Sequence, residues 1–74
     1  MMRKTRLIHS LTADVWQVVN DVKKTCIYYV CAGVVKWNRN GEIDKQNVIY
    51  SSDKINDVLQ FWEKREYNKG VQYE

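Results

Sequence analysis

The chain has 74 residues, of which 45% are hydrophobic and 28% are charged, a balance that is typical of one small globular domain and not of a disordered chain. No stretch approaches 18 consecutive apolar residues, so we expect no membrane-spanning segment and no membrane partner. The net charge of +3 is modest, and residues 1–45 hold eight Lys and Arg against four Asp and Glu, so only this part is basic.

Residues 1–9 form a basic leader without an acidic residue. Its cationic side chains are Arg3, Lys4 and Arg6, with His9 nearby. The leader lacks the apolar run of a secretory signal, so we expect a cytoplasmic protein. The segment from Thr5 to Ile8 has the composition of an edge strand, which would tie the leader to a sheet.

The segment from Leu11 to Val22 predicts a first helix. Its apolar positions recur at i, i+4, i+7 and i+11, which is helical spacing, and they are Leu11, Val15, Val18 and Val22. The β-branched valines favour a strand instead. The alternative is therefore a strand from Val15 to Val19 that would enlarge the sheet.

Two β-rich runs, 26–37 and 42–50, flank turn residues and predict an antiparallel hairpin. A three-residue loop at 39–41, with Gly41 in a left-handed bulge, gives a better register than a two-residue loop of Asn40 and Gly41. The expected cross-strand pairs are Trp37 with Ile43, Lys36 with Asp44, Ala32 with Val48, and Val30 with Tyr50. Both faces of this hairpin are apolar, so we expect helices on one side and the leader, a second copy or a partner on the other.

A second helix is predicted from Asp53 to Tyr67, with a stop near Gly70 and a frayed tail at 71–74. The preceding residues 51–53 supply an N-cap and a first-turn acid. The predicted fold class is therefore α+β, a single domain over residues 1–74. Its order is α-β-β-α, with a central antiparallel hairpin packed against two helices and a possible leading strand.

The sequence contains no motif that indicates catalysis or a cofactor. The three glycines are too scattered for a phosphate-binding loop. Cys26, Cys31 and His9 are too few, and wrongly spaced, for a zinc site, and the two cysteines are expected to be free thiols. We therefore predict a protein that is not an enzyme and that holds no cofactor and no metal.

The remaining surfaces predict binding. Eight of the nine aromatic residues are Trp or Tyr, which dominate protein interfaces. The first hypothesis is thus a non-catalytic protein-binding module, an inhibitor or adaptor. Its expected contact residues are Trp16, Trp37, Arg39, Phe61 and Tyr67. In general style, without any shared motif, the chain resembles the small proteins that phages and mobile elements make to block host factors.

The second hypothesis is a small basic protein that binds RNA or DNA. Its contact residues would be Arg3, Lys4, Arg6, Lys23, Lys24, Lys36 and Arg39. Asp14, Asp21, Glu42 and Asp44 interrupt this basic set, which favours the first hypothesis. A homodimer is a further alternative, because so short a chain gains stability from any added apolar burial.

Overall fold

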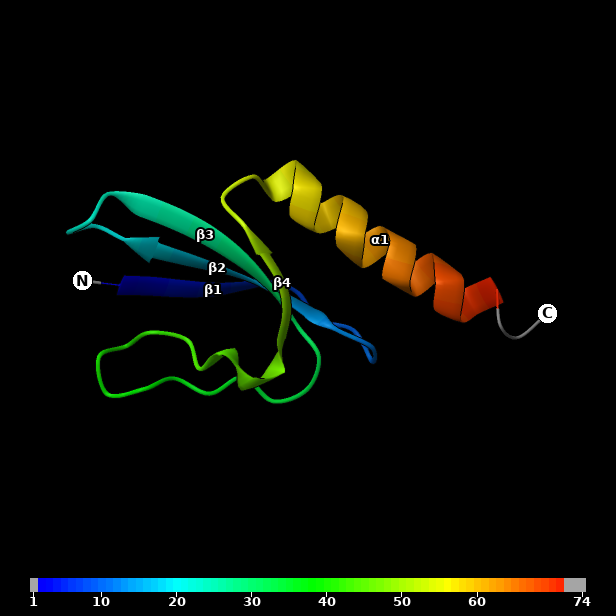
Figure 1. Ribbon diagram of the computed structural model, residues 1–74, viewed down its shortest axis with the longest axis horizontal. Coiled ribbons are helices and arrows are strands. Elements are labelled where there is room, and N and C mark those ends of the chain that lie inside the picture. The colour runs from blue at the N-terminus through cyan, green and yellow to red at the C-terminus, as the bar shows by residue number, and fades with distance from the viewer. Residues whose placement is uncertain (1, 72–74) are drawn as a thin grey trace.

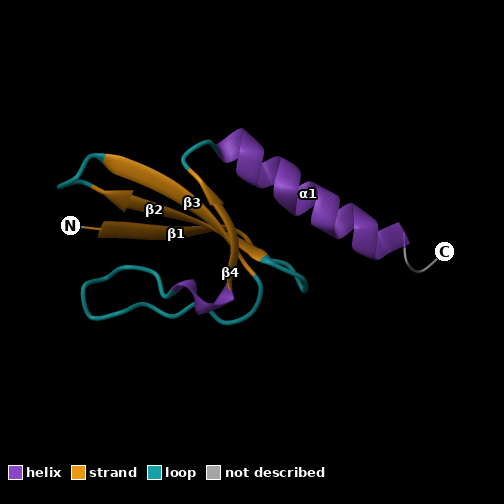
Figure 2. Ribbon diagram, in the orientation of Figure 1, coloured by secondary structure: helices purple, strands orange, loops and turns teal. Residues whose placement is uncertain are grey.

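The fold is a four-stranded antiparallel sheet followed by one helix (Figure 1; Figure 2). A computed structural model describes the backbone of residues 2–71 and the side chains of residues 2–66. The elements, in chain order, are β1 (Met2–Ile8), β2 (Asp14–Asn20), β3 (Thr25–Cys31), a 3-10 turn (Lys45–Asn47), β4 (Val48–Ser52) and α1 (Ile55–Val71).

The strands follow one another across the sheet in the order β1-β2-β3-β4, so β1 and β4 are its edges. The tight turn between β2 and β3 is fixed by Asn20, whose side-chain oxygen accepts from the backbone N–H groups of Val22 and Lys23. Lys24 completes the turn at a φ of 58°. Between β1 and β2 the register shifts at Leu7, which lies between the pairs Arg6 with Trp16 and Ile8 with Val15.

The predicted first helix is wrong, and with it the α-β-β-α fold class. Residues 14–20 form β2, as the alternative strand reading required, and β2 pairs with both β1 and β3. Leu11 and Val22, which completed the helical spacing, lie outside the strand and are exposed. Pairing on both sides suits the β-branched Val15, Val18 and Val19, which overrides the helical period.

The leading strand is confirmed and is longer than expected, because β1 extends from Met2 to Ile8. The hairpin prediction is confirmed only in part. Trp37 bridges Ile43, and Val30 pairs with Tyr50. The expected pair of Ala32 with Val48 is wrong, since Val48 lies opposite Cys31 after a register shift.

The hairpin arms do not run continuously through the sheet. Between β3 and β4, residues 32–47 leave it as a long connection, which we call the return loop. Gly33, at a φ of 109°, turns the chain where this loop begins. The Asn47 side chain closes the base of the loop by donating to the carbonyl of Val34 at 2.6 Å. At the tip, the N–H of Asn38 donates to Glu42 at 2.8 Å, and Gly41 has a φ of 82°.

The two faces of the sheet have different covers. Helix α1 packs on one face of the sheet, which we call the helix face. The return loop lies on the opposite side of the sheet, as Figure 1 shows. The core on the helix face is formed by Ala13, Val15, Val30 and Val58, with Ile8, Tyr28, Tyr50, Phe61 and Trp62 packed against it. A cover on both faces explains why both were apolar in the sequence.

The C-terminal helix is confirmed, although α1 starts two residues later than predicted and continues to Val71. The hydroxyl of Ser52 accepts from the N–H of Lys54 just before the helix, as expected of a residue at this N-terminus. Residues 72–74 of the expected frayed tail lie outside the described residues.

Candidate functional site

On the face of the sheet under the return loop, Trp16 of the sheet meets Trp37 of the loop, and we call this the tryptophan face. Trp16 from β2 and Trp37 from the return loop meet edge to face, with ring centroids 5.5 Å apart and an interplanar angle of 73°. Lys4 from β1 places its Nζ 4.7 Å from the centre of the Trp37 ring. Trp37 therefore anchors the return loop on the sheet by an aromatic and a cation–π contact.

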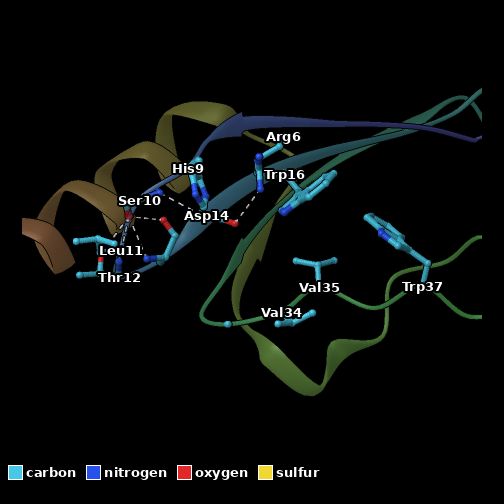
Figure 3. Close-up of a pocket in the computed structure, with 12 residues that line it drawn as sticks. Arg6, His9, Ser10, Leu11, Thr12, Asp14, Trp16, Val34, Val35 and Trp37 are labelled. Carbon is cyan, nitrogen blue, oxygen red and sulfur yellow. Dashed lines mark hydrogen bonds and ion pairs between the residues drawn. The ribbon is translucent and has the colours of Figure 1, made fainter.

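A cavity of about 490 Å³ opens beside these tryptophans, and we call it the tryptophan groove. Its lining comprises Arg6, His9–Asp14, Trp16, Gly33–Val35 and Trp37. Figure 3 shows Val34 and Val35 below the two indole rings, with the polar side chains gathered toward the loop between β1 and β2. Leu11 and Val34 are exposed at its margin. The groove thus has an apolar side and a polar end.

Asp14 organises the polar end. Its carboxylate lies 2.9 Å from His9 Nδ1, accepts from the N–H of Ser10 at 3.2 Å, and lies 3.8 Å from the Arg6 guanidinium. The Asp14 side chain is only 14% exposed, whereas those of Arg6 and His9 are 47% and 67% exposed. The Asp14 carboxylate is therefore enclosed, while the Arg6 guanidinium and the His9 ring still face solvent.

Helix α1 holds the wall of the groove that the β1–β2 loop provides. The Ser10 hydroxyl lies 2.6 Å from both the Ala13 carbonyl and a carboxylate oxygen of Glu66, and Thr12 also bonds this carboxylate. The indole N–H of Trp62 donates to the Ala13 carbonyl at 3.1 Å. The bonds of the Ser10 hydroxyl to Ala13 and to Glu66 of α1 therefore hold the β1–β2 loop in shape.

One donor in the groove wall lacks a partner. The indole N–H of Trp16 is buried, and within residues 2–66 it finds no hydrogen-bond acceptor. Such a group costs on the order of 1–3 kcal/mol relative to a paired one. An acceptor that reached this N–H after a shift of the covering side chains would recover that cost.

The structure brings together two of the five expected protein-binding residues. Trp16 and Trp37 share the groove, while Arg39 is exposed at the tip of the return loop. Phe61 lies on the helix face, where its ring stacks on that of Tyr50 at 4.6 Å and packs against the core. The side chain of Tyr67 lies outside the described part of the chain.

The expected nucleic-acid contacts divide between the two faces of the sheet. Lys4 and Arg6 lie on the tryptophan face, near Trp37 and Trp16 respectively. Arg3 alternates to the other face and pairs with Asp21 at 3.1 Å. Lys24, Lys36 and Arg39 are exposed on the β2–β3 turn and the return loop.

A second cavity of about 360 Å³ brings two of the expected basic residues together with the tip of the return loop. Lys4 of β1 and Lys23 of the β2–β3 turn line it together with Asn40 and Gly41 at the tip of the return loop. Glu42 is also part of its lining, so a carboxylate sits among these cations.

The thiols are placed apart from one another. Cys31 is 1% exposed, and burial, with the nearby Asp14 charge second, raises the pKa of its thiol to about 11. Cys26 is partly exposed on the helix face, 3.7 Å from the Gln17 side-chain nitrogen. Among the described residues, no group of three His, Cys, Asp or Glu side chains is arranged to hold a metal ion.

Sequence reasoning missed Leu11, Val34 and Val35 as groove residues and missed the role of Asp14. Val34 and Val35 continued a strand pattern in the sequence, and the turn at Gly33 is what moves them out of the sheet.

Within residues 2–71, no helix combines the length and the apolar character needed to cross a bilayer.

Comparison of the chain with protein-family models, with curated proteins and with solved structures found no match.

Proposed function

We propose that this protein is a non-catalytic protein-binding module, an inhibitor or adaptor, whose tryptophan groove receives an apolar side chain from an acidic segment of its partner. The observation that carries the proposal is the groove itself, where Trp16, Val35 and Trp37 form an apolar side next to the exposed Arg6 guanidinium. Pockets that combine aromatic walls with a few polar groups are where protein interfaces concentrate their binding energy.

The apolar margin supports a macromolecular partner. Val34 is 72% exposed and Leu11 is fully exposed, so the apolar surface continues outward from the groove. A side chain inserted between these residues would remove both its own surface and theirs from water, at roughly 25 cal/mol per Å². A full apolar side chain contributes on the order of 1.5–3 kcal/mol in this way, which is the size of an interface anchor.

The charges support an acidic partner. The net charge is +3. Arg6 is an exposed lining residue of the groove, and the exposed Lys36 stands between the lining residues Val35 and Trp37. Asp14, the carboxylate in the groove, has a side chain that is only 14% exposed, whereas that of Arg6 is 47% exposed, so the charge that the groove presents to solvent is mainly the cationic one. Carboxylates of a partner would meet a positive rim, which raises the rate of association and selects against basic partners.

The state of Trp37 favours a protein over a nucleic acid. Base stacking needs a free aromatic face, but Lys4 lies over the Trp37 ring and Trp16 contacts it edge to face. Glu42 and Asp44 also stand among the cations Lys36, Arg39 and Lys45 of the return loop, so this loop offers no continuous basic stripe to a phosphate backbone.

The test is selection from a displayed peptide library on the purified protein, followed by affinity measurements with two matched variants. We expect enriched peptides to carry an aromatic or branched apolar residue flanked by Asp or Glu. Val34→Asp, at the groove, should weaken them by about tenfold or more, equivalent to 1.4 kcal/mol. Val22→Asp places the same charge on a valine that is 79% exposed away from the groove, and should change affinity less than twofold. Equal effects of the two variants, or enrichment without acidic and apolar residues, would contradict the proposal.

A further inference from the structure

Strand β1 presents an open backbone edge. It pairs with β2 on one side, and within residues 2–71 no other strand pairs with it. From Met2 to Arg6 its register with β2 is regular, and every residue from Arg3 to Leu7 is exposed. An edge of this length offers its outward N–H and C=O groups to one more strand.

The side chains of this edge are cationic on both faces. Lys4 and Arg6 lie on the tryptophan face, next to Trp37 and Trp16, and Arg3 lies on the opposite face. A strand added to β1 would therefore have Lys4 and Arg6 beside it on the tryptophan face. On the opposite face it would have Arg3, whose exposed ion pair with Asp21 leaves the guanidinium open to solvent. Directly opposed cross-strand charges attract when they differ in sign and repel when they agree.

Two copies of this chain are not expected to pair through their β1 edges. Consider antiparallel pairing of two β1 strands over at least four residues of the regular stretch Met2–Arg6. The three possible registers place Arg3 opposite Lys4, Lys4 opposite Lys4, or Arg3 opposite Arg6. Each register opposes like charges, so β1 resists self-association and accepts a segment of opposite charge.

We propose that β1 docks an extended acidic segment of a partner protein, which adds to the sheet as a fifth strand. Backbone hydrogen bonds to the open edge would provide the affinity, and carboxylates opposite Arg3, Lys4 and Arg6 would provide the selectivity. This goes beyond the proposed function, because the edge is a different surface from the margin of the tryptophan groove at Val34.

The probe is a synthetic eight-residue peptide of alternating Glu and Val, titrated into the ¹⁵N-labelled protein and followed by amide shifts and hydrogen exchange. A control peptide of the same sequence carries an N-methyl group on every residue. It keeps every charge and every apolar side chain but cannot donate a backbone hydrogen bond to β1, so it should lose binding. We expect the parent peptide to give shifts and new amide protection along β1. Equal binding of the methylated peptide, or no binding of the parent peptide, would overturn strand addition.

Two matched variants separate strand addition from general electrostatics. Thr5→Glu places a negative charge in the middle of β1, and Thr25→Glu makes the same change at an exposed threonine of β3. We expect Thr5→Glu to weaken the peptide about threefold to fivefold and Thr25→Glu to leave it within about 1.5-fold. The groove variant Val34→Asp should also leave this peptide bound. If Val34→Asp weakens the peptide and Thr5→Glu does not, the peptide binds in the groove, and the edge proposal is overturned. This test does not depend on the library selection, so the groove proposal can fail while the edge proposal holds.

Discussion

The contact between Trp37 and the sheet should hold the return loop in place, and Trp37→Ala is the perturbation that measures it. Three losses contribute. The edge-to-face contact with Trp16 is worth about 0.5–1.5 kcal/mol, and the Lys4 cation over the ring about 0.5–1 kcal/mol. Trp37 is partly buried, and roughly 100 Å² of apolar burial at 25 cal/mol per Å² gives about 2.5 kcal/mol more. We therefore expect the free energy of unfolding to fall by about 3.5–5 kcal/mol.

The assay is urea denaturation followed by far-UV circular dichroism, with Trp37→Phe as the control that keeps a ring. Hydrogen exchange then locates the loss. The N–H groups of Asn38 and Asp44, bonded within the return loop, should lose protection more than those of Val58 in α1. A loss below about 1 kcal/mol in Trp37→Ala would refute the reasoning, because the ring would then not be packed on the sheet.

Three further outcomes follow from the core and the thiols. Val58 is fully buried, so Val58→Ala should cost about 2–3 kcal/mol in urea unfolding, against less than about 1 kcal/mol for the partly exposed Ile55→Ala; similar losses would contradict the observed helix orientation. Burial raises the pKa of Cys31 from 9.0 to about 11, so its contribution to stability is complete below pH 9 and is lost as the pH rises toward 11. That loss is about 2–3 kcal/mol and should be absent in Cys31→Ala, whereas parallel pH curves for the two proteins would contradict it. A thiol reagent at pH 8 should label Cys26 first, with Cys31 reacting only on unfolding, and simultaneous labelling would show that Cys31 is not buried.

The elements that the sequence predicted correctly are those whose local signals agree with their surroundings. Around α1, the Ser52 hydroxyl, the apolar period and the later glycine all favour one helix. The pairs Trp37 with Ile43 and Val30 with Tyr50 followed from matching charges and apolar side chains across a turn. Such signals act over a few residues, and the fold did not contradict them.

The errors arise where distant parts of the chain decide the outcome. Val15, Val18 and Val19 fit a helical period, but β1 and β3 offer pairing on both sides of them. The tryptophan groove was hidden for the same reason, because it requires the return loop to fold back so that Trp37 reaches Trp16. Periodicity within one segment carries no information about which segment returns to cover it.

The bonds from Glu66 to Ser10 and Thr12 link residues more than fifty positions apart in the chain. Through these bonds, the packing of α1 on the sheet is coupled to the shape of the β1–β2 loop in the groove wall. Thermodynamic linkage makes this coupling reciprocal. A ligand in the groove must disfavour the state in which α1 has lifted off the sheet, by the same free energy with which a seated α1 tightens the ligand. Occupancy of the groove can therefore be measured from the helix, without observing the ligand at all.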